Sequence, residues 1–213
     1  MDCTTNKLEE AVKFYSEHCD YSKGFDFIKK CIESDISNYS KAAVIVYGPH
    51  QTRILNDKKY DLTKKLEKNV PWQEKYLNFE DIYSKISSIL NPFKGRVSLY
   101  DISFRLGIAI NILPDSFVYI TSLKVINNTK KILGIKSYPG IKRPRTDFPI
   151  ALQTLESWQI EDFICHVEIE ETPSGLIYTI KERPFKPFSN YPSEVIKEIA
   201  PIWKEVYNLN LKK

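Results

Sequence analysis

Residues 79–110 read FEDIYSKISSILNPFKGRVSLYDISFRLGIAI and decide the fold, because they carry the clearest helical pattern in the chain. In 79–90, apolar residues recur every three or four positions and acidic residues take the opposite side, which indicates an amphipathic helix. In 99–110, nearly every residue after Leu106 is apolar, as in a helix at the centre of a core. We therefore predict two central helices, the second capped by Ser98.

If these two helices form the core, Ile86, Ile102 and Leu106 should be almost fully buried. Elsewhere, apolar spacing indicates further helices, and β-favouring runs around a glycine-containing turn indicate a hairpin. The further helices are expected at 6–19 (capped by Thr4 or Thr5), 25–33, 122–133, 158–167 (capped by Ser157) and 193–207. The expected strands are 117–120, 165–169 and 176–180, with 42–47 open between helix and strand and 56–68 a solvated helix or loop.

The composition is that of a globular protein. The chain has 213 residues, of which 42% are hydrophobic and 27% charged, so it can bury a core without a disulfide or metal. We predict a mainly α fold with a small β-hairpin (α+β), as one compact multi-helix domain over 1–213 that includes a degenerate helix-hairpin-helix. Its expected parts are an N-terminal helical part (1–70), a central helical core (71–167) and a C-terminal hairpin plus helix (168–213).

The four cysteines, Cys3, Cys19, Cys31 and Cys165, form neither a C-x-x-C pair nor a set with zinc-ligand spacing. We therefore expect reduced thiols, no metal and no cofactor. The first ten residues are polar and lack the features of a targeting signal. The apolar runs are far shorter than the roughly 20 residues of a membrane span. These features predict a cytoplasmic protein that does not contact membranes.

Charge is unevenly distributed along the chain, although the net charge is only +4. Residues 136–145 contain four basic residues and no acid, whereas residues 146–180 contain seven acids and no Lys or Arg. The two segments either pair with each other inside the protein or form separate surfaces for different partners. In the second case Lys142, Arg143 and Arg145 are candidate contacts to the phosphates of a nucleic acid.

The turn between the two central helices resembles a degenerate helix-hairpin-helix. In that motif, backbone amides of a glycine-containing turn bind a DNA phosphate at the start of the next helix. Gly95 would provide the turn, and Lys94 and Arg96 would provide positive charge. The usual second glycine is missing here. A DNA glycosylase of this kind also needs a carboxylate soon after the hairpin, and Asp115 lies at a suitable distance in sequence.

Arg105 lies inside an otherwise apolar helix, where a guanidinium without a partner would cost several kcal/mol. Asp101 lies one helical turn earlier, and Glu161 and Asp162 are alternative partners. We predict that Arg105 is buried and paired with one of these carboxylates. The alternatives are an arginine that anchors a ligand in a pocket, and simple exposure.

His50 follows a Gly-Pro turn and precedes Gln51 and Arg53. This combination can bind a phosphate, and the imidazole can act as a general base. The sequence places no nucleophile beside His50, so a structural, hydrogen-bonded histidine is the alternative. No phosphate-binding loop, dinucleotide fingerprint or hydrolase motif is present.

Four segments resemble a bacterial protein family that has a helix-hairpin-helix-like core and no established activity. The segments correspond to P-H-Q-x-R-I, L-x-x-Y-D-x-x-x-R-I-G, V-Y-L and I-E-D-F-L-C patterns. They lie at 48–54, 97–107, 117–119 and 160–165. The chain departs from the family at 93–95, where members carry a G-I-G hairpin, and at 120–122, where members carry a glycine-bearing turn.

Three functions remain open at this point. The first is a nucleic-acid-associated protein that contacts phosphates with the hairpin and the basic loop. The alternative is a non-catalytic interaction or small-ligand-binding domain, and the third is a hydrolase or transferase built around His50. Whether the protein is an enzyme is therefore undecided. The pocket candidates are His50, Gln51, Arg53, Tyr100, Asp101, Arg105, Glu161 and Asp162.

Overall fold

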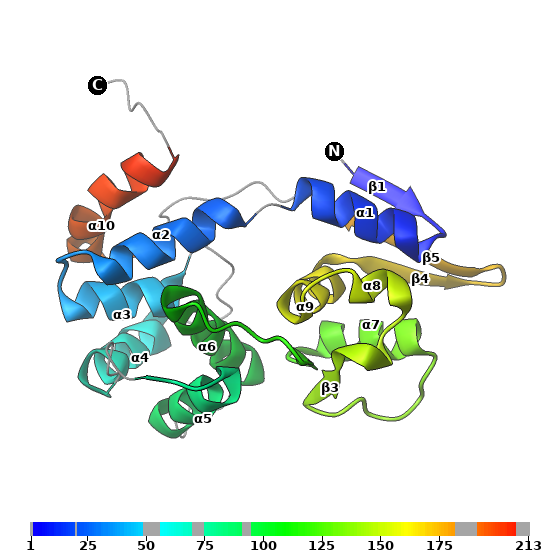
Figure 1. Ribbon diagram of the computed structural model, residues 1–213, viewed down its shortest axis with the longest axis horizontal. Coiled ribbons are helices and arrows are strands. Elements are labelled where there is room, and N and C mark those ends of the chain that lie inside the picture. Colours follow the sequence, from blue (N-terminus) through cyan, green and yellow to red (C-terminus); the bar gives the residue numbers. More distant parts are fainter. Residues whose placement is uncertain are drawn as a thin grey trace. The chain divides into compact units, whose positions relative to one another are not determined.

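The computed structural model describes residues 2–19, 21–48, 56–69, 75–90, 95–181 and 191–207. These residues form helices for the most part, together with short antiparallel strands (Figure 1). The predicted mainly α, α+β class is therefore confirmed. Within the described residues, no helix combines the length and the apolar character needed to cross a membrane.

The chain divides into two units, and each unit contains two separate segments of sequence. Unit 1 comprises Met1–Asp20 and Pro114–Pro184, and unit 2 comprises Tyr21–Leu113 and Phe185–Lys213. Neither unit coincides with one of the parts expected from the sequence, which were divided at residues 70 and 167. The division differs because segments near the two ends of the chain pair with distant elements.

Unit 2 is built from helices, with α6 at its centre. Helix α6 packs against α5, α2 and α3, while α4 packs on α3 and α10 packs on α2 and α3. Ile86, Ile102 and Leu106 are at most 1% exposed, which confirms the predicted central pair. The helices of unit 2 are α2 (Ser22–Glu33), α3 (Asn38–Tyr47), α4 (Asn56–Asn69), α5 (Phe79–Leu90), α6 (Arg96–Ile110) and α10 (Ser193–Tyr207).

Two details of unit 2 correct the sequence predictions. Helix α6 begins at Arg96, with Gly95 at its N-cap, so Ser98 lies within the first turn and does not cap it. The segment expected to be a solvated helix or loop forms α4, which buries Leu62 and Leu66 against the unit. The many charged residues of this segment hide its apolar side in the sequence, because only two leucines form that side.

Unit 1 combines a three-stranded antiparallel sheet, in the order β1-β5-β4, with a two-stranded ladder of β2 and β3. Helix α1 contacts β1 and β5, and α7 contacts α9 and β4. The strands are β1 (Asp2–Thr5), β2 (Phe117–Tyr119), β3 (Lys142–Pro144), β4 (Glu168–Thr172) and β5 (Gly175–Lys181). The helices are α1 (Leu8–His18), α7 (Leu123–Leu133), α8 (Ile150–Gln153) and α9 (Ser157–His166), with a 3-10 turn at Arg145–Asp147.

The predicted hairpin is confirmed, because β4 and β5 pair across the turn that precedes Gly175. Two predicted caps are wrong. Thr4 and Thr5 belong to β1, a strand that was not predicted, and Ser157 is the first residue of α9. Glu156 caps α9 instead, because its side chain and that of Gln159 form a capping box.

A buried amide fastens α7 to the end of α9. The Nδ2 group of Asn128 donates hydrogen bonds of 2.9 Å to the carbonyl oxygens of Ile164 and Val167. Asn128→Ala removes both donors, and we expect it to lower the free energy of unfolding by about 1–3 kcal/mol. Urea unfolding measures this decrease. The exposed neighbour Asn127 is the control, since Asn127→Ala should have almost no effect; equal decreases in the two variants would contradict the prediction.

Candidate functional site

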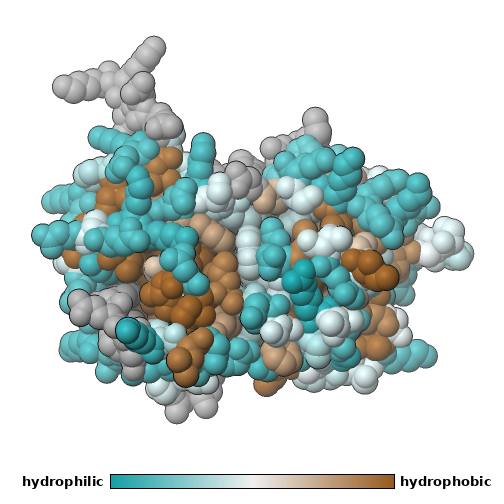
Figure 2. Space-filling view, viewed as in Figure 1, coloured by the Kyte–Doolittle hydropathy of each residue, from teal (hydrophilic) through white to brown (hydrophobic). Residues whose placement is uncertain are grey.

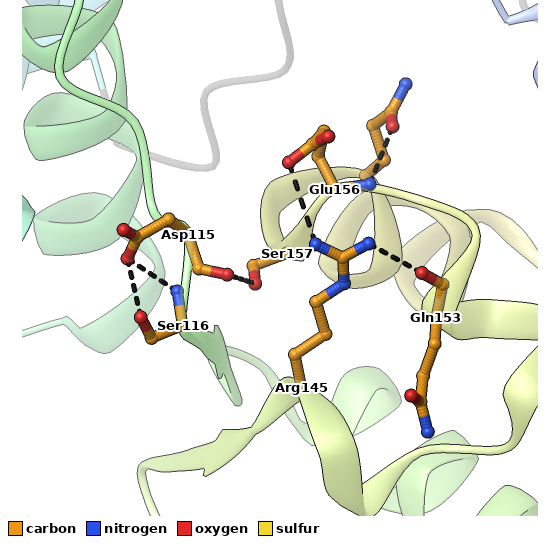
Figure 3. Close-up of polar contacts among 7 residues, drawn as sticks. Asp115, Ser116, Arg145, Gln153, Glu156 and Ser157 are labelled. Atoms are coloured by element: carbon orange, nitrogen blue, oxygen red, sulfur yellow. Dashed lines mark hydrogen bonds and ion pairs between the residues drawn. The ribbon is translucent and has the colours of Figure 1, made fainter.

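In the basic loop of unit 1 (residues 136–145), Arg145 bonds to neighbouring segments of the same unit (Figure 3). Its Nη2 donates a 2.5 Å hydrogen bond to the carbonyl oxygen of Gln153, and its Nη1 lies 3.8 Å from Oε2 of Glu156. Its backbone amide donates to the carbonyl oxygen of Ser116 at 3.0 Å. Arg145 therefore connects the 3-10 turn to the last residue of α8, to the N-cap of α9 and to the residue before β2.

The other two cations of this loop also have partners within unit 1. The Nη2 of Arg143 lies 2.7 Å from Oδ2 of Asp147. The ammonium group of Lys142 lies 4.3 Å from the centre of the Phe117 ring, within the range of a cation–π contact. Two acids of the 146–180 segment thus pair with two arginines of the 136–145 segment, as the internal-pairing alternative expected.

The side-chain and backbone oxygens of Asp115 accept hydrogen bonds from nearby groups (Figure 3). Its Oδ1 accepts hydrogen bonds from the backbone amide of Ser116 at 2.5 Å and from the Ser116 hydroxyl at 2.9 Å. Its carbonyl oxygen accepts a 2.5 Å hydrogen bond from the Ser157 hydroxyl at the start of α9. These contacts give Asp115 a structural role, since it fixes the entry to β2.

The predicted hairpin contacts are described only in part. Gly95 has φ −86°, a value open to any residue, and precedes α6 as its N-cap. Arg96 is the first residue of α6 and is exposed. Lys94 lies outside the described residues, as do His50, Gln51 and Arg53.

Arg105 is buried, as predicted, with 2% of its surface exposed. Its Nη1 donates hydrogen bonds to the carbonyl oxygens of Ile45 at 3.0 Å and Val46 at 3.2 Å. Both carbonyls belong to the last turn of α3, where a helix leaves carbonyl groups without partners in the helix itself. The cation also faces the negative end of the helix dipole. Arg105 therefore caps α3 from the neighbouring helix α6.

Gly48 allows the chain to leave α3 beside this guanidinium. Its φ is +49°, in the region that favours glycine. A Cβ atom built at this position would lie 2.0 Å from Nε and 2.4 Å from Cζ of Arg105. Glycine is thus required here for two reasons, its backbone conformation and the closeness of the arginine.

Burial and a neighbouring carboxylate have opposite effects on Arg105. Burial lowers the pKa of the guanidinium, while the negative charge of Asp101 opposes this decrease. Burial also strongly raises the pKa of the phenol of Tyr191, which precedes α10, so this side chain is neutral at ordinary pH. Tyr100, by contrast, is a core residue that stacks on Phe104 with ring centres 5.8 Å apart.

Glu161 and Asp162 have partners within unit 1. The Thr121 hydroxyl donates a 2.7 Å hydrogen bond to Oε1 of Glu161, and the Tyr15 hydroxyl donates one of 2.7 Å to Oδ2 of Asp162. His166 Nδ1 lies 3.1 Å from Oδ1 of Asp162. The expected pairing of either carboxylate with Arg105 of unit 2 stays a prediction.

Lys59 is a buried charge that was not predicted from the sequence. It lies on the inner face of α4 and is 2% exposed. Its ammonium group lies 5.0 Å from the centre of the Tyr47 ring. Burial lowers the pKa of Lys59, and the positive charge of Arg105 lowers it further. The available signal was spacing, because Lys59 precedes Leu62 and Leu66 by three and seven residues, on one side of a helix.

In the part of the chain that the structure describes, no three His, Cys, Asp or Glu side chains are grouped so that they could hold a metal ion. All four cysteines are thiols outside any disulfide, and Cys31 is buried. Burial raises the pKa of the Cys31 thiol to about 12, which keeps it protonated and unreactive at neutral pH.

Comparison with protein-family models, with curated proteins and with solved structures found no match to this chain.

Proposed function

We propose that the protein associates with nucleic acid through unit 2. The supporting observation is the separation of charge between the units. Unit 2 contains 20 Lys and Arg against 13 Asp and Glu, for a net charge of +7, whereas unit 1 contains 11 against 14, for a net charge of −3. A domain with an excess of positive charge attracts the phosphate backbone without regard to sequence.

Helix α4 provides a surface for such contacts. Lys58 and Lys68 are exposed and Lys65 is half-buried, and their spacing of seven and three residues places them on one side of the helix. These three lysines form the stripe on α4. The carboxylate of Asp61 lies close to the stripe in sequence and offsets part of its positive charge. Figure 2 shows hydrophilic residues along the left border of the drawn face, where Figure 1 places helices of unit 2.

The proposed contacts differ from those predicted from the sequence. In unit 1, Arg143 and Arg145 have the carboxylates of Asp147 and Glu156 beside them, and these neutralise much of the loop's charge. A phosphate would have to compete with both carboxylates. The stripe on α4 offers cations in the unit that carries the positive excess.

A salt titration of DNA and RNA binding tests this proposal. We expect the logarithm of the association constant to fall linearly with the logarithm of the salt concentration, because phosphate contacts release counterions. Changing Lys58, Lys65 and Lys68 together to Gln should reduce the slope for duplex DNA by roughly 0.9 for each phosphate that these lysines neutralise. Fluorescence anisotropy with labelled oligonucleotides provides the measurement.

The matched control changes three exposed lysines of unit 1, namely Lys7, Lys13 and Lys181, to Gln. This variant removes the same amount of charge, and it should leave the slope unchanged. Binding that does not depend on salt, or an equal change of slope in both triple variants, would overturn the proposal.

A further inference from the structure

Lys59 has a buried ammonium group whose charge no described residue neutralises. No hydrogen bond or ion pair of this ammonium is found among the described residues, and its described contact is the face of the Tyr47 ring at 5.0 Å. A cation–π contact is a weak attraction. Removing an ammonium group from water costs considerably more, even after the protein relaxes. The ring therefore offsets only part of the cost.

A second buried cation, Arg105, makes the surroundings of Lys59 more positive. The positive charge of Arg105 acts on Lys59 unfavourably, and Arg105 is also 2% exposed. The negative charge of Asp101 acts on Arg105, whereas the charge that acts on Lys59 is the positive charge of Arg105.

Aromatic rings lie beside the two cations. The Tyr47 ring, under the Lys59 ammonium, stacks on the Tyr191 ring with centres 5.5 Å apart and an angle of 25° between the planes. Tyr47 is itself buried. Surroundings of this kind exclude water, so an opposite charge beside Lys59 would interact with it much more strongly than in solvent.

We propose that Lys59, supported by the charge of Arg105, binds a small oxyanion, either a phosphate or a carboxylate group. An oxyanion only accepts hydrogen bonds, and an ammonium group donates three, so the two match in chemistry as well as in charge. With 2% of its surface exposed, Lys59 is out of reach of a nucleic-acid backbone, so the ligand is a small molecule. The site is therefore independent of the stripe on α4.

Thermal unfolding of the full chain tests the site, with inorganic phosphate and acetate as probes at constant ionic strength. Sodium chloride replaces each probe in the reference samples, so that general salt effects cancel. At a hundredfold excess over its dissociation constant, a bound anion should raise the unfolding midpoint by roughly 5–10 °C. A larger shift with phosphate assigns a phosphate ligand, and a larger shift with acetate assigns a carboxylate ligand.

Variants of Lys59 separate binding from other effects. Lys59→Met keeps the length of the side chain and removes the charge. The variant should abolish the anion-induced rise of the unfolding midpoint. Without anion, its midpoint should equal or exceed that of the wild type. Lys59→Arg should keep a shift, because it keeps the charge. The control is Lys58→Met, an exposed neighbour on the same helix, which should respond to anions as the wild type does.

Three results would overturn the site. One is a wild type that neither anion stabilises more than chloride does. Another is a Lys59→Met variant that keeps the full shift. The third is a Lys59→Met variant that unfolds well below the wild type in chloride, because the ammonium would then be needed for folding itself.

Discussion

Arg105→Ala should lower the free energy of unfolding by about 3–5 kcal/mol, the decrease expected when one partner of a buried charged interaction is removed. The variant leaves the carbonyl groups of Ile45 and Val46 without the donor that reaches them at 3.0 and 3.2 Å. It also leaves the charge of Asp101 without the buried cation on which it acts. Both effects weaken the packing of α3 on α6.

Chemical denaturation followed by circular dichroism measures this decrease. The control is Lys23→Ala on α2 of the same unit, since Lys23 is exposed and its removal should change stability by about 0.5 kcal/mol or less. Arg105→Lys should recover only part of the stability, because an ammonium group lacks the planar fork of the guanidinium. A decrease below about 1 kcal/mol for Arg105→Ala would show that the cap is dispensable.

Gly48→Ala should lower the free energy of unfolding by about 2–6 kcal/mol. Strain from the positive φ contributes about 1–3 kcal/mol, and overpacking in a core contributes a similar amount. The added methyl group would lie 2.0 Å from Nε of Arg105, so the guanidinium must move away from the carbonyl groups that it caps.

Gly134→Ala is a matched control for this prediction. Gly134 also has a positive φ, +63°, but a Cβ atom there would meet nothing within 4 Å. Gly134→Ala should therefore show the cost of the backbone conformation alone. Combining Gly48→Ala with Arg105→Ala should cost less than the sum of the two, because the clash disappears with the guanidinium. Additive effects would exclude the clash as the cause.

Local sequence patterns predicted most of the helices. The apolar spacing of 79–90 matches α5, and the spacing of 193–207 matches α10. The hairpin was also predictable, because β4 and β5 are neighbours in sequence. Strand β1 was not, since its four residues pair with a strand more than 170 positions away and show no pattern of their own. Caps were misplaced by a few residues where several polar side chains compete for the same helix end.

The candidate site was predictable to a similar extent. A charge within an apolar helix indicated that Arg105 is buried, and the structure confirms this. Its two backbone acceptors were not predicted, because Ile45 and Val46 come from a helix about 60 residues earlier and carbonyl groups have no sequence signal. Lys59 was missed because a charged side chain in a charged segment is usually solvated.

The pairing of β1 with β5 affects how the protein folds during its synthesis. β1 leaves the ribosome before its partner β5, which begins at Gly175, 170 residues after the end of β1 at Thr5. At about 5–20 residues per second, β5 follows roughly 10–35 s later. The packing of unit 2 is delayed in the same way, because α10 packs on α2 and α3 and is made long after both. Neither unit can complete its packing until its second segment has emerged, so both units stay incomplete for longer during synthesis than a domain that is continuous in sequence.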